Sequence, residues 1–182
     1  RIGNENYSEK KLVDISIAQL NFSLIDKIDN NKLNTRYEQI MEIINQNNSD
    51  LLIFAENDYP YLVSSLKELN FMATRLNKNQ SIVIGATKKE NLQFYNTFLL
   101  IEKNKIQDFD KMILVPFGEF LPFRIFINFL DKIVGKNDFS IGNKTRLIKT
   151  SSNLKMIPII CYEIIFFNNL LNIYNIDSDV LV

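Results

Sequence analysis

Short apolar runs that alternate with stretches of helical periodicity constrain the fold of this 182-residue chain more than any other feature. Residues 13–20, 51–54 and 81–87 are rich in β-branched or large apolar side chains, which predicts strands. Between them, residues 32–47 and 63–76 place apolar side chains on one face at helical spacing. Further strands are predicted at residues 91–102, 146–150, 155–161 and 179–182. This alternation, followed by paired strands, is typical of an α/β domain.

The composition limits the catalytic chemistry open to the chain, but it identifies no binding partner. The hydrophobic fraction of 46% is ample for one core, and 21 basic residues balance 21 acidic ones. That balance gives no indication of a nucleic-acid partner. The chain has no histidine, which removes Ser-His and Cys-His mechanisms and most zinc sites. Proton transfer near neutral pH must therefore use carboxylates, lysine amines or a thiol.

Both ends of the sequence indicate a piece of a longer polypeptide. The chain begins Arg-Ile-Gly and ends within the apolar run at residues 179–182. No apolar stretch approaches the roughly 18 to 20 residues that cross a bilayer. We therefore expect any membrane anchor to lie outside the sequence given.

The single cysteine, Cys161, occupies a position typical of a reactive group. It follows the apolar run at residues 156–160 and precedes a predicted helix at residues 164–174. Ligand sites of open α/β sheets lie at the carboxyl ends of strands, and a helix N-terminus stabilises a thiolate. The alternative is that Cys161 is a small buried hydrophobic residue, as many lone cysteines are.

Two other candidate reactive groups also fall at the ends of predicted strands or in the loops after them. Glu56 comes after an apolar run, and a carboxylate in an apolar cleft can take a thiol proton. Lys111 could supply positive charge to a developing oxyanion, and the backbone N–H of Tyr162 could supply a second donor. The alternatives are that Glu56 is a carboxylate at a helix start and that Lys111 is a solvated loop residue.

Three stretches of the sequence carry a resemblance to a known family. They are residues 52–56 (LIFAE), 110–122 (DKMILVPFGEFLP) and 160–163 (ICYE). Together with residues 179–182 they resemble the apolipoprotein N-acyltransferases, a membrane branch of the nitrilase superfamily. The resemblance covers residues 13–182, and a plain nitrilase or amidase does not usually combine the second and third stretches. The family usually has Trp-Pro before the base, where this chain has Phe54-Ala55.

The resemblance implies a nitrilase-like α-β-β-α sandwich that is C-terminally incomplete. Residues 13–182 would form this truncated carbon–nitrogen hydrolase domain, and residues 1–12 would lead in from a preceding membrane region. In the implied triad, Glu56 is the general base and Cys161 is the nucleophile. Lys111 is the cation that positions the base and stabilises the oxyanion. Glu119 would support this triad, and Glu163 would orient the nucleophile turn.

The function implied is transfer of a fatty acyl chain from a phospholipid, through a cysteine thioester, to the N-terminal cysteine amine of apolipoproteins. Two half-reactions at one cysteine give ping-pong kinetics. The resemblance implies no metal or organic cofactor, no nucleic acid, and a catalytic domain that faces the periplasm from the bacterial inner membrane. The alternatives are a soluble nitrilase-family amidase acting on small amides and a catalytically inactive gene remnant.

Large aromatic side chains near the motifs are candidates for contact with the acyl chain or lipid. They are Phe54, Phe117, Phe123 and Phe126. The segment 120–130 would form a lid that touches lipid, with Arg124 at headgroup depth. The alternative is that this segment is a helix of the core.

Overall fold

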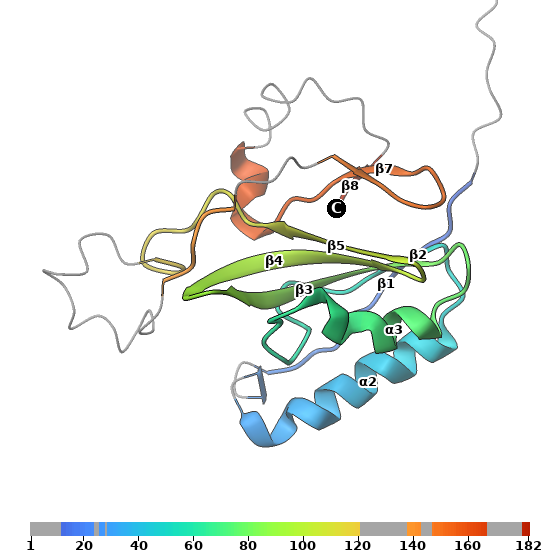
Figure 1. Ribbon diagram of the computed structural model, residues 1–182, viewed down its shortest axis with the longest axis horizontal. Helices are drawn as coiled ribbons and strands as arrows, with labels where there is room; N and C mark the ends of the chain where they lie inside the picture. Colours follow the sequence, from blue (N-terminus) through green and yellow to red (C-terminus); the bar gives the residue numbers. More distant parts are fainter. Residues whose placement is uncertain (1–11, 24–25, 28, 121–137, 143–146, 167–179) are drawn as a thin grey trace, which may run out of the picture.

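Two β-sheets lie face to face in the computed structural model, and helices cover the outer face of the larger sheet (Figure 1). The structure describes residues 12–23, 26–27, 29–120, 138–142, 147–166 and 180–182. The α/β class predicted from the sequence is confirmed. The described residues form three layers in the order helices, large sheet, small sheet.

The larger sheet has five strands in the order of the sequence. Its strands are β1 (Ile15–Ile17), β2 (Leu51–Ile53), β3 (Ser81–Glu90), β4 (Gln93–Glu102) and β5 (Lys105–Asp110). The first three are parallel, and β3, β4 and β5 are antiparallel neighbours. Thr97 pairs with Asp110, so the register places the residue before Thr97 beside the first residue after β5.

The helical layer packs on one face of this sheet because both helices carry an apolar stripe. Its elements are η1 (Asn30–Lys32), α2 (Leu33–Gln46), η2 (Leu66–Leu69) and α3 (Asn70–Arg75). The side chains of Ser65 and Asp29 accept hydrogen bonds from backbone N–H groups at the starts of η2 and η1. The buried helical residues Ile40 and Met72 belong to one core cluster with Ile84 of β3.

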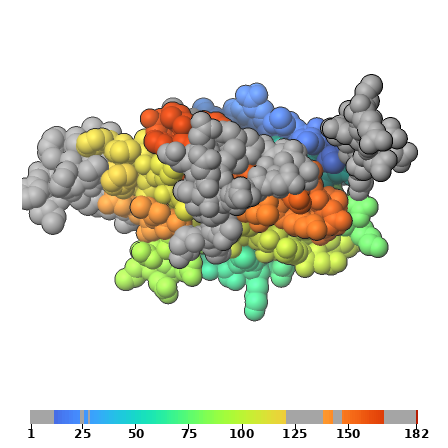
Figure 2. Space-filling model, turned by 90° about the horizontal axis from the view of Figure 1, so that it is seen from above, coloured from blue at the N-terminus to red at the C-terminus, as the bar shows by residue number. Residues whose placement is uncertain are grey.

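The smaller sheet closes the opposite face of the larger one. It consists of β6 (Ile148–Lys149), β7 (Lys155–Ile157) and β8 (Val180–Leu181), with β7 in the middle. Alternate residues of β4 point to the two faces, so Phe98 packs with Met156 while Leu99 packs with the helices. Figure 2 looks onto this side, where residues 147–166, in orange to red, lie over the large sheet.

Several predicted boundaries were wrong, and backbone pairing explains most of them. The helix expected from residue 63 begins only at Leu66, because Val63 forms a parallel bridge with Lys88. The strand expected at residues 13–20 is only Ile15–Ile17. Cys161 lies beyond the end of β7, at the start of the 3-10 helix η4 (Cys161–Phe166).

Two other expectations fall outside the described residues. These are the lid predicted at residues 120–130, of which only residue 120 is described, and the part of the helix predicted at residues 164–174 that lies beyond residue 166. Within the part of the chain that the structure describes, we find no helix with the length and apolar character needed to cross a membrane.

Candidate functional site

The structure brings Glu56, Lys111 and Cys161 to one place at the same end of the two sheets. Glu56 lies in the turn after β2, Lys111 follows β5 directly, and Cys161 opens η4. Lys111 Nζ lies 3.8 Å from Glu56 Oε1. Glu56 and Cys161 line the same cavity, which has a volume of about 140 Å³. Three groups that are distant in the sequence are therefore neighbours in the fold.

Lys111 is held between two carboxylates and is almost completely removed from solvent. Its side chain is 1% exposed, and Nζ lies 2.9 Å from Glu119 Oε1. The other oxygen of Glu119 accepts a hydrogen bond from the backbone N–H of Val115 at 3.0 Å, which fixes that carboxylate within its own loop. The alternative of a solvated loop lysine is therefore wrong.

Cys161 is exposed, so the alternative of a cysteine sealed in the core is also wrong. Its backbone has φ 52°, in the left-handed region. Among the described non-glycine residues with positive φ, only Cys161 and Phe117 are not asparagine, which tolerates this conformation best. Sharp turns of this kind present a nucleophile to solvent at the end of a strand, and strained backbone concentrates at functional sites.

Glu163 joins the cysteine turn to the loop that follows Lys111. One carboxylate oxygen accepts hydrogen bonds from the backbone N–H groups of Met112 at 2.7 Å and Ile113 at 3.0 Å. The other oxygen accepts from the N–H of Ile160 at 3.0 Å. Because Glu163 is fully buried, these bonds fix the separation between the residues beside Lys111 and the residue before Cys161.

The remaining residues predicted at the site differ in exposure and position. Phe54 is buried and lines the cavity that contains Cys161, whereas Phe117, between Lys111 and Glu119, is 57% exposed. Tyr162 follows Cys161 in η4 with its ring half exposed and packed against Phe166 at 5.9 Å. Phe123 and Phe126 lie outside the described residues.

Asn96 is the main site residue that the sequence reasoning missed. Its side-chain amide donates to Glu56 Oε1 at 2.5 Å and to Glu119 Oε1 at 2.8 Å. Its backbone oxygen accepts from the N–H of Lys111 at 2.8 Å. A signal was present in the sequence, because Asn96 and Thr97 interrupt an otherwise apolar strand pattern. A buried polar side chain in such a strand requires a partner.

Gly85 allows the turn that carries Glu56 to lie against β3. A Cβ at this position would come within 2.6 Å of Glu56 Cα and 2.7 Å of the nitrogen of Asn57. Both are backbone atoms, which cannot rotate away as a side chain could. A glycine within a strand pattern is a sequence signal for such a close approach.

The Gly85→Ala substitution is therefore expected to displace the Glu56 turn and to lower the free energy of unfolding by about 1 to 3 kcal/mol. Urea denaturation measures the free energy of unfolding, and the rate of Cys161 alkylation reports whether the site is disturbed. The matched control is Gly118→Ala, because a Cβ there meets only Val115, at 3.5 Å or more. An unchanged unfolding curve for Gly85→Ala would contradict the close contact.

A second buried charge network supports Lys111 from the strand before it. Lys88 Nζ lies 2.6 Å from Asp108 Oδ2 and 2.7 Å from Asp110 Oδ2, and Thr97 donates to the other oxygen of Asp110 at 2.6 Å. Burial acts to lower the pKa of Lys88, but the hydrogen bonds to the two aspartates outweigh it and raise the pKa. Lys88 therefore stays charged and fixes the residue next to Lys111.

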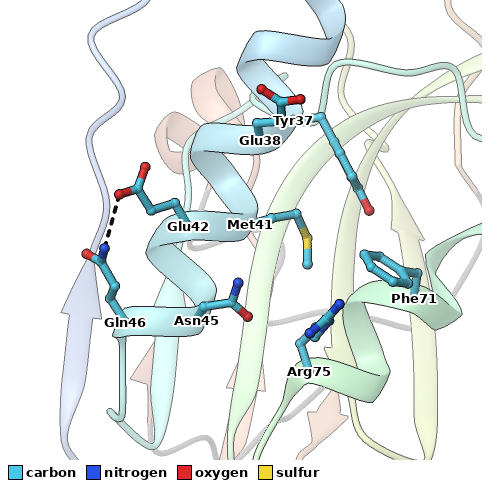
Figure 3. A pocket seen from close by; sticks show the side chains of 8 residues that line it. All are labelled: Tyr37, Glu38, Met41, Glu42, Asn45, Gln46, Phe71 and Arg75. Atoms are coloured by element: carbon cyan, nitrogen blue, oxygen red, sulfur yellow. Dashed lines mark hydrogen bonds between the residues drawn. The ribbon is translucent and has the colours of Figure 1, made fainter.

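A larger pocket lies away from these groups. It has a volume of about 530 Å³ between α2 and α3, where Tyr37, Met41 and Phe71 face one another (Figure 3). Arg75 lies over the ring of Phe71 at 4.8 Å. The pocket is a shallow groove on the helical layer, whereas the smaller cavity contains the thiol.

The chemistry open to the site is nucleophilic catalysis with carboxylate assistance. A thiol and a carboxylate share one cavity, and an ammonium group lies beside the carboxylate. Over the residues that are described, no group of three or more His, Cys, Asp or Glu side chains is arranged to hold a metal ion.

Comparisons with known proteins relate this chain to one group of enzymes. No protein-family model matches the chain. The curated apolipoprotein N-acyltransferase of Rhizobium rhizogenes is 29% identical over 133 residues, which are 66% of this chain and 25% of that protein. That of Wigglesworthia glossinidia brevipalpis is 28% identical and covers 97% of this chain, with 38% of its own length matched. The chain thus spans only a minor part of these relatives.

Solved structures give the fold. Saccharomyces cerevisiae Nit3, of the nitrilase superfamily, aligns with a TM-score of 0.54 at 18% identity, covering 88% of this chain and 59% of Nit3. A CN-hydrolase superfamily protein from Xanthomonas campestris aligns with a TM-score of 0.51 at 17% identity, covering 76% of this chain and 50% of its own. The chain is therefore homologous to a segment of the apolipoprotein N-acyltransferases, and its fold is that of the nitrilase superfamily.

Proposed function

We propose that this chain carries the catalytic centre of an N-acyltransferase that moves a fatty acyl group from a phospholipid to the N-terminal cysteine amine of an apolipoprotein. One observation carries the proposal. In a chain homologous to apolipoprotein N-acyltransferases, Cys161 and Glu56 line one cavity, and Lys111 lies 3.8 Å from that carboxylate. Membrane association of the whole enzyme and a periplasmic orientation belong to the same proposal.

In the first half-reaction, Glu56 takes the thiol proton of Cys161, and the thiolate attacks the ester carbonyl carbon of the phospholipid. The tetrahedral oxyanion is stabilised by Lys111 and by the N–H of Tyr162. The C–O bond then breaks, and the proton held by Glu56 passes to the departing lysophospholipid oxygen. The product is a thioester on Cys161, with Glu56 again ionised.

In the second half-reaction, the amine of the lipoprotein attacks the thioester carbon. Glu56 accepts the amine proton, the C–S bond breaks, and the proton returns to the sulfur. The acyl group must be protected from water between these steps. Phe54, Val83 and Phe98 supply apolar surface to the cavity, and this lining supports the proposal.

Intact-protein mass spectrometry after incubation with phospholipid vesicles tests the proposal. The protein is expected to gain the mass of one fatty acyl chain on Cys161, and the adduct should disappear when a peptide with a lipidated N-terminal cysteine is added. Cys161→Ser should form no such exchangeable adduct. Absence of any adduct on folded protein would overturn the proposal, and ammonia release from small amides would favour an amidase.

A further inference from the structure

Asn96 bonds to the two carboxylates that flank the Lys111 ammonium group and to the backbone of Lys111. Its Nδ2 donates to Glu56 Oε1 at 2.5 Å and to Glu119 Oε1 at 2.8 Å, so each N–H of the amide serves one carboxylate. Its backbone oxygen accepts from the N–H of Lys111. Asn96 is 2% exposed and lines the cavity that contains Cys161.

The orientation of this amide follows from its neighbours. Two carboxylate oxygens lie against one end of the side chain, and only the –NH₂ end can donate to both. The reversed amide would place its oxygen against two anionic oxygens. Asn96 Oδ1 then faces away from them, and it is buried without a hydrogen-bond partner among the described residues. The cost of that unsatisfied acceptor indicates that donation to both carboxylates fixes the amide.

The two carboxylate oxygens of Glu56 differ in their contacts. Oε1 receives the amide of Asn96 and is the oxygen close to Lys111. For Oε2, the described part of the chain supplies no hydrogen-bond donor. An oxygen without a donor is the better proton acceptor, since hydrogen bonds to the charged form stabilise it.

We propose that Asn96 is a positioning residue that holds Glu56 by Oε1 and leaves Oε2 to take the proton of the Cys161 thiol. This inference rests on the proposed function, because it assigns the base role to Glu56. Asn96 forms no bond to substrate in this account. It acts only through Glu56, and it keeps Glu56 and Glu119 together around the single ammonium group of Lys111.

A double-mutant cycle on the rate of Cys161 alkylation by iodoacetamide tests this assignment. Cys161 is the only cysteine of the chain, so the reaction reports one thiol. Asn96→Ala is expected to slow alkylation at pH 7 about tenfold, and Glu56→Gln about a hundredfold, the lower end of the effect of a general base. The double variant should be no slower than Glu56→Gln alone, within about twofold, because both changes remove one function.

A multiplied loss of about a thousandfold in the double variant would overturn the proposal, since additive effects indicate independent roles. An unchanged rate in Asn96→Ala would overturn it as well. Asn96→Ser provides a second variant with less lost volume if the alanine variant does not fold. Asn45→Ala, on the exposed face of α2, is the control and should leave the rate unchanged.

The same proteins separate this proposal from the proposed function. Alkylation needs neither lipid nor amine, so a non-additive cycle without any acyl adduct would retain the positioning role and remove the acyltransferase. An acyl adduct together with an additive cycle would retain the acyltransferase and remove the positioning role.

Discussion

Replacing Lys111 with methionine is expected to lower the free energy of unfolding by about 3 to 5 kcal/mol, because it removes one partner from a buried ion pair. The side chain is 1% exposed, and its ammonium group lies 2.9 Å from Glu119 and 3.8 Å from Glu56. Methionine fills a similar volume without charge. The lost free energy of unfolding therefore reports the cost of leaving two carboxylates close together without the cation between them.

Lys111→Met should impair activity more strongly than it impairs stability. The rate of acyl adduct formation in Lys111→Met is expected to drop by about a hundredfold or more, the usual effect of losing an oxyanion donor. Urea denaturation at pH 7 measures the stability.

The control for this substitution is Lys103→Met, which changes the same charge in the exposed turn between β4 and β5. Its unfolding curve should match that of the unmodified protein within about 0.5 kcal/mol. A Lys111→Met variant as stable as this control would show that the two carboxylates do not depend on the ammonium group.

The fold was predictable from the sequence where burial follows a simple period. Strands β2, β3 and β4 and helix α2 were found within a few residues, since their apolar side chains repeat at two or 3.6 residues. The start of η2 was missed because Val63 forms a bridge with Lys88, which lies on a strand far along the chain. Pairing of this kind leaves no local pattern in the sequence.

The candidate site was likewise predictable only in part. Glu56, Lys111 and Cys161 were identified as candidates because they fall at strand ends or in the loops after them and within the motifs of the resemblance, and the structure places them together. Asn96 was missed because strand periodicity says which face a side chain takes but not which charges lie there. The contribution of Gly85 also required the three-dimensional path of the Glu56 turn, although its position inside an apolar strand was a signal.

The roles of these residues have a common physical basis, which is the stacking of two sheets. Lys111 directly follows the last strand of the large sheet, and Cys161 follows the small one. The core between the sheets is made of apolar side chains such as Phe98 and Met156. Such contacts resist separation more than they resist sliding. A hydrogen bond from the N–H of Ser151 to Glu102 joins the sheets at the other end of β4, away from Asn96. A directional link near the site is therefore needed to fix the thiol relative to the charged groups.

Glu163 is that link, and Glu163→Ala is expected to lower the free energy of unfolding by about 4 kcal/mol. Three backbone N–H groups lose their acceptor, and each unsatisfied buried donor costs about 1 to 3 kcal/mol, with partial relief where water enters. Two of those donors follow Lys111, and the third precedes Cys161. The alkylation rate of Cys161 should also lose its dependence on Glu56→Gln, because the thiol is no longer held beside its base.

Glu163→Gln separates the acceptor from the charge. Its amide oxygen can still accept from Met112 and Ile113, but its –NH₂ group then faces the N–H of Ile160. We expect a loss of about 2 kcal/mol, between that of alanine and none. Glu38→Ala, on the exposed face of α2, is the matched control and should change stability by less than about 0.5 kcal/mol. Equal unfolding curves for Glu163→Ala and Glu38→Ala would contradict the link, because a carboxylate without buried bonds would have no such cost.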